Sequence, residues 1–241
     1  MNENVPKILF ECAEYTVIEK PAGIVTHPTR EGETGALTEW LLEQYPELKQ
    51  VGDDPVMRPG IVHRLDKEVS GLMVIPRTQK MYEHLKEQFQ KHTMQKEYLA
   101  LVYGKILKSE GIITFPIARS ARGHRMSSRS DEKKDEGREA VTEYVVLRYV
   151  GRTGGERHGY TLVHLIPRTG RTHQIRAHMH SLGHPIVGDK LYRIRKQKRR
   201  EDLDRIFLHA QRLGFHTLTG EWVMYESSLP EQLTHFLEQK Q

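Results

Sequence analysis

Residues 140–166 read AVTEYVVLRYVGRTGGERHGYTLVHLI, and this stretch decides the fold. Two runs rich in β-branched and aromatic residues, 140–150 and 160–166, flank a glycine-rich turn at residues 151–159. Such runs are typical of β-strands, and glycine lets the chain reverse between them. The stretch therefore predicts two long antiparallel strands joined as a hairpin.

The rest of the chain alternates irregularly between short strands and helices. Further strands are predicted at residues 8–11, 15–18, 71–75, 98–103, 206–208 and 222–225. Helices are predicted at residues 36–45, 79–92 and 172–182, with a last amphipathic segment ending at Leu237.

Hairpin-length connections favour an α+β fold with a mostly antiparallel sheet over a doubly wound parallel sheet. Thr78 and Thr172 precede two of the helices, where a hydroxyl can accept from a free backbone N–H, so we expect both as N-caps. Gly183 follows the second of these helices and can take the left-handed conformation that ends it. No linker divides the chain, so we expect a single domain over residues 1–241.

Composition excludes several classes of protein. Hydrophobic residues make up 37% of the 241 and charged residues 29%, which suits one large core and argues against disorder. No run of 18 apolar residues or signal peptide is present, and the one cysteine, Cys12, excludes an internal disulfide. We expect a soluble cytoplasmic protein. The net charge of +5 favours a polyanionic partner.

Common cofactor and hydrolase motifs are absent from the sequence. It has no phosphate-binding G-x-x-x-x-G-K, no G-x-G-x-x-G, no G-x-S-x-G and no H-E-x-x-H. His173, His178, His180 and His184 lie within twelve residues, but cationic neighbours disfavour a metal ion there. We expect these histidines to be structural or to face a nucleic acid, and we expect no metal and no cofactor.

Residues 59–71, PGIVHRLDKEVSG, hold the best candidate for chemistry. Asp66 lies between Arg64 and Lys67 in a short loop, and nearby cations favour an ionised carboxylate. An ionised carboxylate suits a nucleophile better than a general acid. An ordinary loop salt bridge explains the same residues.

The same segment resembles H-R-L-D-x-x-T-S-G of the RluA family of pseudouridine synthases. Other segments similar to that family follow in the same order: EKPAG at 19–23, KEYLALV at 96–102, RTGRTHQIRAHM at 168–179, LGHPIVGD at 182–189 and LHA at 208–210. The resemblance covers roughly residues 8–230. It implies a pseudouridine synthase-like fold, a mostly antiparallel mixed sheet flanked by helices with a central RNA-binding cleft.

The resemblance also implies the catalytic residues of a uridine-to-pseudouridine isomerase. Asp66 would be the nucleophile, Tyr98 would stack on the flipped uracil, and Arg176 would pair with the catalytic carboxylate. A uracil inside folded RNA must leave its stack, at about a few kcal/mol, and stacking on an aromatic ring returns about 1–3 kcal/mol.

Substrate-binding roles follow from the same motifs. Arg64 would enter the RNA stack where the base leaves, and Leu208 would line the base pocket. His63 and Arg171, from the same two segments, would also bind substrate. Leu208 could equally be a core residue, since core packing and pocket lining bury it in the same way.

Two basic tracts, residues 119–138 and 190–200, are expected to face phosphates, although a solvated charged face explains them too. The first, which lacks apolar periodicity, is predicted to be a mobile arm. Arg195, Lys196 and Lys198 are the expected RNA-backbone contacts. The partner would be an rRNA or tRNA stem-loop rather than DNA or a membrane, and the protein a monomer.

Two positions depart from the family pattern. Val69 stands at a usual Thr, and Glu19 at a usual Asn. Family members often carry an N-terminal S4-type RNA-binding module, and we expect none here because the catalytic-type sequence begins near Ile8. Two alternatives stay open. One is a catalytically silent RNA-binding or ribosome-assembly protein on this scaffold, and the other is a glycosidase-like enzyme using Asp66 with Glu68.

Overall fold

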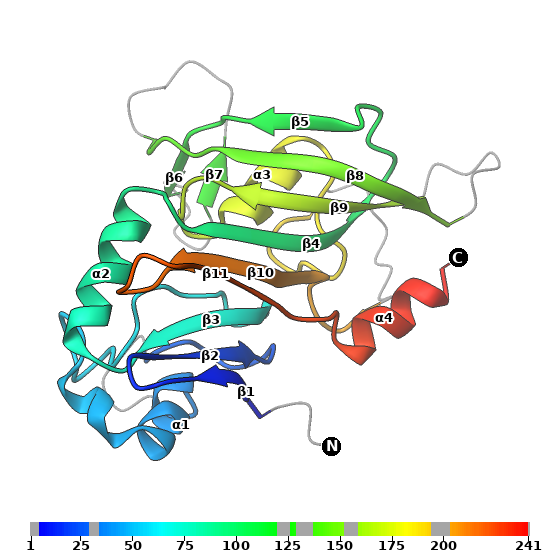
Figure 1. Ribbon diagram of the computed structural model, residues 1–241. Helices are drawn as coiled ribbons and strands as arrows, with labels where there is room; N and C mark the ends of the chain where they lie inside the picture. Colours follow the sequence, from blue (N-terminus) through cyan, green and yellow to red (C-terminus); the bar gives the residue numbers. More distant parts are fainter. Residues whose placement is uncertain are drawn as a thin grey trace. The chain divides into compact units, whose positions relative to one another are not determined.

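The computed structural model describes residues 5–28, 34–119, 126–128, 137–151, 159–193 and 203–240. The chain forms two compact units, and Figure 1 labels their helices and strands. The first comprises Met1–Gln95 and Ala210–Ser227, and the second comprises Lys96–His209 and Ser228–Gln241. Among the described residues, no helix has the length and apolar character needed to span a bilayer. That both units make up one catalytic domain stays a prediction.

The first unit is built on antiparallel strands. β1 (Lys7–Glu11) pairs with β2 (Tyr15–Lys20), which pairs with β3 (Ser70–Pro76). β3 lies next to β10 (Leu208–His216), whose residues from Ala210 onward belong to this unit. β10 pairs with β11 (Trp222–Glu226). The other predicted strands of this unit are confirmed, but of the strand predicted at residues 206–208 only Leu208, the first residue of β10, is in a strand.

Two α-helices and a short 3₁₀ helix accompany these strands. α1 (Leu37–Gln44) leads directly into the 3₁₀ helix Pro46–Gln50, and α2 (Gln79–Gln90) follows β3. The Thr78 hydroxyl accepts from the Met81 amide at 3.2 Å, which confirms it as the N-cap of α2. The core of this unit combines both helical and strand residues: Tyr15, Val17, Leu72, Val74, Met81, Leu85, Met94, Leu213 and Phe215.

The second unit contains the predicted long hairpin. β8 (Thr142–Val150) and β9 (Tyr160–Pro167) pair antiparallel, with an irregularity between Val146 and Arg148. β4 (Gln95–Tyr103) pairs with β9, and β5 (Glu110–Ile113) pairs with β8. These antiparallel pairs confirm the α+β prediction, and the RNA-binding cleft stays a prediction.

Helices complete the second unit. α3 (Gln174–Ser181) contacts β7, β8 and β9, and α4 (Glu231–Glu238) lies near the end of the chain. The predicted cap of α3 was wrong: His173 is its N-cap residue, with a left-handed φ of 53° and no side-chain capping bond. Gly183, with φ of 86°, ends α3 as predicted.

Part of the basic tract at residues 119–138 forms a strand, where a mobile loop or arm was predicted. β6 (Ile117–Arg119) pairs antiparallel with β7 (Met126–Ser128). The three-residue β7 is too short to show periodicity within a polar sequence, so the pattern could not reveal it. Residues 120–125 and 129–136 lie outside the described part of the chain.

Candidate functional site

The turn that carries Asp66 lies immediately before β3. The Val69 amide donates to the Asp66 carbonyl at 3.1 Å, which closes the turn through the backbone. Arg64 is exposed and Asp66 is half-buried, whereas Val69 is only 2% exposed. The turn therefore presents an arginine and a carboxylate on an anchored backbone. Its closure uses the backbone amide of residue 69 and does not depend on that residue's side chain.

A fully buried lysine, Lys20, anchors the backbone of this turn. The Lys20 ammonium, at the end of β2, donates to the Pro21 carbonyl at 2.8 Å, the Ile24 carbonyl at 2.9 Å and the Lys67 carbonyl at 3.4 Å. The Gly23 amide adds a bond to the Lys67 carbonyl at 2.7 Å. A buried ammonium is tolerated only where such acceptors satisfy it. Lys20 thus ties the residues next to Asp66 to the β2 turn.

Further contacts hold the rest of the segment. The buried Thr26 hydroxyl donates to the Leu65 carbonyl at 2.9 Å and accepts from the Leu65 amide at 3.3 Å. The His63 Nε2 accepts from the Val74 amide at 3.1 Å, and the ring stacks on Phe89 with centroids 4.8 Å apart. These contacts give His63 a structural role, and its role in substrate binding stays a prediction.

Glu19, the second departure from the family pattern, also has a partner. Its carboxylate accepts from the Ser227 hydroxyl at 2.5 Å. This bond joins the end of β2 to the residue that follows β11. The Ser227 amide in turn donates to the Gln211 carbonyl at 2.9 Å. The carboxylate therefore has a structural use within the first unit.

In the second unit, Tyr98 is half-buried on β4, opposite Leu165 of β9. The adjacent Glu97 is buried and pairs with His164 at 2.8 Å. Alternate residues of a strand point to opposite faces of the sheet, so Tyr98 and Glu97 point to opposite faces. Leu208, at the start of β10, is 3% exposed.

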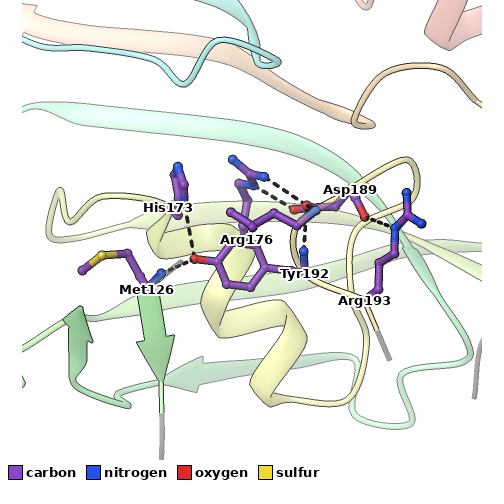
Figure 2. A network of polar contacts seen from close by, with 7 residues as sticks. Met126, His173, Arg176, Asp189, Tyr192 and Arg193 are labelled. Atoms are coloured by element: carbon purple, nitrogen blue, oxygen red, sulfur yellow. Dashed lines mark hydrogen bonds and ion pairs between the residues drawn. The ribbon is translucent and has the colours of Figure 1, made fainter. Parts of the chain in front are cut away.

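Arg176 is almost fully buried on α3, where a solvated helix face would have been the ordinary expectation. Its Nε donates to Asp189 Oδ2 at 2.7 Å, and its second terminal nitrogen donates to Oδ1 at 3.0 Å (Figure 2). Two parallel bonds of this kind fix the plane of a guanidinium. The predicted pairing of Arg176 with Asp66 stays a prediction.

Gln174 and Arg171 organise the loop before α3. The buried Gln174 amide oxygen accepts from the Thr169 hydroxyl at 2.7 Å and from the Arg171 amide at 3.0 Å. Its NH₂ donates to the Val141 carbonyl at 2.9 Å and to the Thr142 hydroxyl at 3.0 Å. The half-buried Arg171 donates from Nε to the Glu139 carbonyl at 3.0 Å. The glutamine therefore fixes the loop before α3, and it does not replace the side-chain cap that was predicted for Thr172.

Lys96 opens the second unit two residues before Tyr98. Burial lowers the pKa of the Lys96 ammonium to about 8, because a charged group loses solvation inside the protein. The amine is therefore partly neutral near physiological pH.

Two of the clustered histidines hydrogen-bond to structural groups. The His178 ring contacts the Thr142 hydroxyl at 2.9 Å and the Phe115 carbonyl at 2.8 Å, and burial lowers the pKa of His178. His184 Nδ1 lies 2.9 Å from the Tyr103 carbonyl. Within the described ranges, no group of three or more His, Cys, Asp or Glu residues could hold a metal ion.

The predicted site residues fall on both units. The first carries His63, Arg64 and Asp66 on one turn, and the second carries Tyr98, Arg171, Arg176 and Leu208. Arg195, Lys196 and Lys198 lie outside the described residues.

Sequence reasoning missed three anchoring residues, Lys20, Gln174 and Asp189. Each belongs to a segment quoted for the family resemblance, and each is a polar residue that the fold buries. Their place inside those motifs was the available signal, but their partners lie elsewhere in the chain.

Comparisons with known proteins agree with the resemblance. Residues 14–181 match the family described as RNA pseudouridylate synthase. An uncharacterised RNA pseudouridine synthase of Aquifex aeolicus is 39% identical over 236 residues, covering 95% of this chain and 71% of that protein. The ribosomal large subunit pseudouridine synthase D of Pseudomonas aeruginosa is 36% identical, covering 96% of this chain and 70% of that protein.

A solved structure is also similar. Human RNA pseudouridylate synthase domain containing 1 matches with a TM-score of 0.76 and 27% identity, covering 95% of this chain and 86% of that chain. The likeness therefore extends from sequence motifs to the whole fold.

Proposed function

Because the chain belongs to the RNA pseudouridylate synthase family, we propose that it isomerises a specific uridine of a structured rRNA or tRNA to pseudouridine, with Asp66 as the nucleophile. The uracil N1–C1′ bond breaks, the base rotates, and a C5–C1′ bond forms. The C5 proton leaves to water and N1 takes up a proton, so the product has the same atoms and the same charge as the substrate.

The observation that carries the proposal is how the Asp66 turn is held. Lys20, Thr26 and the Val69 amide fix its backbone, while Arg64 is exposed and Asp66 is half-buried. A nucleophile needs a fixed approach to the reacting atom, and fixing it in advance removes much of the entropic barrier. The exposure of Arg64 suits insertion into an RNA stack.

The second unit supplies the other proposed roles. Tyr98 receives the flipped uracil on its ring, and Leu208 packs against the base. Arg176 stabilises the ionised nucleophile, since a carboxylate beside a neutral base needs a fixed cation. Its bidentate partner Asp189 keeps that cation in place.

The test separates synthase, hydrolase and silent binder in one experiment. We would incubate tRNA and rRNA transcripts with the protein, digest them to nucleosides, and quantify pseudouridine and free uracil. Pseudouridine without free uracil is the expected result. Free uracil would support the glycosidase-like alternative, and binding of RNA without either product would support a silent binder and contradict the proposal.

A further inference from the structure

A single buried arginine is the centre of a polar network in the second unit. Arg176, on α3, is 4% exposed, and both oxygens of Asp189 accept its hydrogen bonds (Figure 2). The Asp189 carboxylate is completely buried. Removing either side chain would leave the charge of the other buried without a partner, which is strongly unfavourable. The ion pair therefore holds both side chains in place.

Asp189 is itself held by the backbone that follows it. Its Oδ1 accepts from the Leu191 amide at 2.8 Å and from the Tyr192 amide at 3.0 Å. Just before it, Gly188 has φ of 75°, and a Cβ there would lie 1.9 Å from the Arg205 carbonyl oxygen. Only glycine fits that approach. The Asp189 carboxylate thus accepts four hydrogen bonds, two from Arg176 and two from backbone amides.

Tyr192 completes the network from the other side. It is 1% exposed, and its ring centroid lies 5.3 Å from the Arg176 guanidinium carbon, within the range of a cation–π contact. Its hydroxyl accepts from the Met126 amide of β7 at 2.8 Å and lies 3.3 Å from His173 Nδ1. One tyrosine thus joins β7, in the basic tract, to the arginine on α3.

We propose that Asp189 and Tyr192 are positioning residues for the isomerisation: Asp189 fixes the orientation of the Arg176 guanidinium, and the Tyr192 hydroxyl couples that orientation to the placement of β7. This inference rests on the proposed function. A free arginine side chain samples many rotamers, and ordering it costs about 2 kcal/mol. A guanidinium ordered in advance needs no rearrangement as the reaction proceeds.

The substitutions separate the two contributions. Asp189→Asn keeps the shape and removes the charge, whereas Tyr192→Phe keeps the ring against the guanidinium and removes only the hydroxyl. Tyr149→Phe is the matched control, since it also removes a hydroxyl, one that donates to the Ile106 carbonyl at 2.8 Å in the same unit.

The kinetic readout is the single-turnover rate of tritium release from RNA labelled at uracil C5, measured beside the RNA dissociation constant. We expect Asp189→Asn to lower the rate constant by roughly 10- to 100-fold, the loss typical of a misplaced group. We expect Tyr192→Phe to lower it by a smaller factor, about 3- to 10-fold. RNA affinity should stay within about twofold, because positioning acts on the reaction step. Rates of both variants equal to that of Tyr149→Phe would overturn the inference.

A second readout needs no activity. The Nε–Hε resonance of Arg176, assigned by its loss in Arg176→Lys, should shift in Asp189→Asn and exchange faster with solvent in Tyr192→Phe. An unchanged resonance in both variants would overturn the inference. A wild type that releases no tritium would overturn the proposed function, while this resonance still reports whether Asp189 and Tyr192 fix Arg176. If Asp189→Asn does not fold, Tyr192→Phe decides.

Discussion

At the scale of single residues, the structure replaces an apparent surface loop by an anchored turn. Lys20 donates to three backbone carbonyls and is fully buried, so the residues around Asp66 are held by a cation that never reaches solvent. The position of Asp66, the proposed nucleophile, therefore depends on a side chain 46 residues earlier in the chain.

Lys20→Met tests that dependence. It removes the ammonium and leaves buried carbonyls without their donor, so we expect the free energy of unfolding to fall by at least about 2 kcal/mol. Chemical denaturation measures the change. Lys80→Met, at an exposed position of α2, is the control and should stay within about 0.5 kcal/mol of wild type. Equal stability of the two variants would contradict the anchoring role.

Lys96 gives a prediction in pH. Its pKa is about 8 in the folded protein and near 10.5 in the unfolded chain, so between these values the unfolded chain binds more protons. Stability therefore rises with pH across that window, by about 3 kcal/mol at most. Lys96→Met should lose this rise and the exposed Lys108→Met should keep it. Denaturation midpoints at pH 8, 9 and 10 measure the difference, and an equal rise in both variants would contradict it.

The sequence motifs identified the candidate residues but not the side chains that these residues contact. The sequence pointed to Asp66, Arg64 and Arg176, because they lie in recognisable segments. It did not reveal that Asp189 binds Arg176, because the two lie 13 residues apart and meet only when the loop after α3 folds back.

At the scale of elements, periodicity predicted most strands and helices. Thr78 caps α2 as expected because its hydroxyl lies next to a free amide, a purely local feature. β10 was underestimated, since adjacent polar residues at 211 and 212 interrupt the alternation of its sequence. His173, the N-cap residue of α3, has a left-handed φ of 53°, which the periodicity of the helix sequence does not reveal.

Gly71 marks a close approach between elements. Its φ is 125°, and a Cβ there would lie 2.3 Å from the Ala210 carbonyl oxygen of β10. Gly220 has φ of 82° with open space around it, so an alanine there introduces the backbone strain without a steric clash. We expect Gly220→Ala to cost about 1 kcal/mol and Gly71→Ala at least about 2 kcal/mol more. Equal denaturation midpoints would contradict the close approach of β3 and β10.

At the scale of the whole molecule, the excess of basic residues concerns binding. The net charge of +5 is modest, so its effect depends on clustering. Seven of the eleven residues from 190 to 200 are basic and none is acidic. Neutralising phosphates releases counterions, which makes RNA affinity fall steeply with salt.

Reversing Arg195, Lys196 and Lys198 to Glu should weaken RNA binding and flatten its salt dependence. Loss of three phosphate contacts lowers the slope of log affinity against log salt by about 2–3. Reversal of the exposed Lys49, Lys80 and Lys108 gives the same change in net charge and should have a smaller effect. Titrations at several salt concentrations measure both, and equal slopes would contradict the assignment.

The central claim is that Asp66 performs the isomerisation, and tritium release from RNA labelled at uracil C5 tests it most directly. Asp66→Asn and Glu68→Gln each remove one negative charge from the same short turn. We expect wild type and Glu68→Gln to release tritium at similar rates, and Asp66→Asn to release none. Release by Asp66→Asn at the rate of wild type would contradict the claim, because the C5 hydrogen would then leave without this carboxylate.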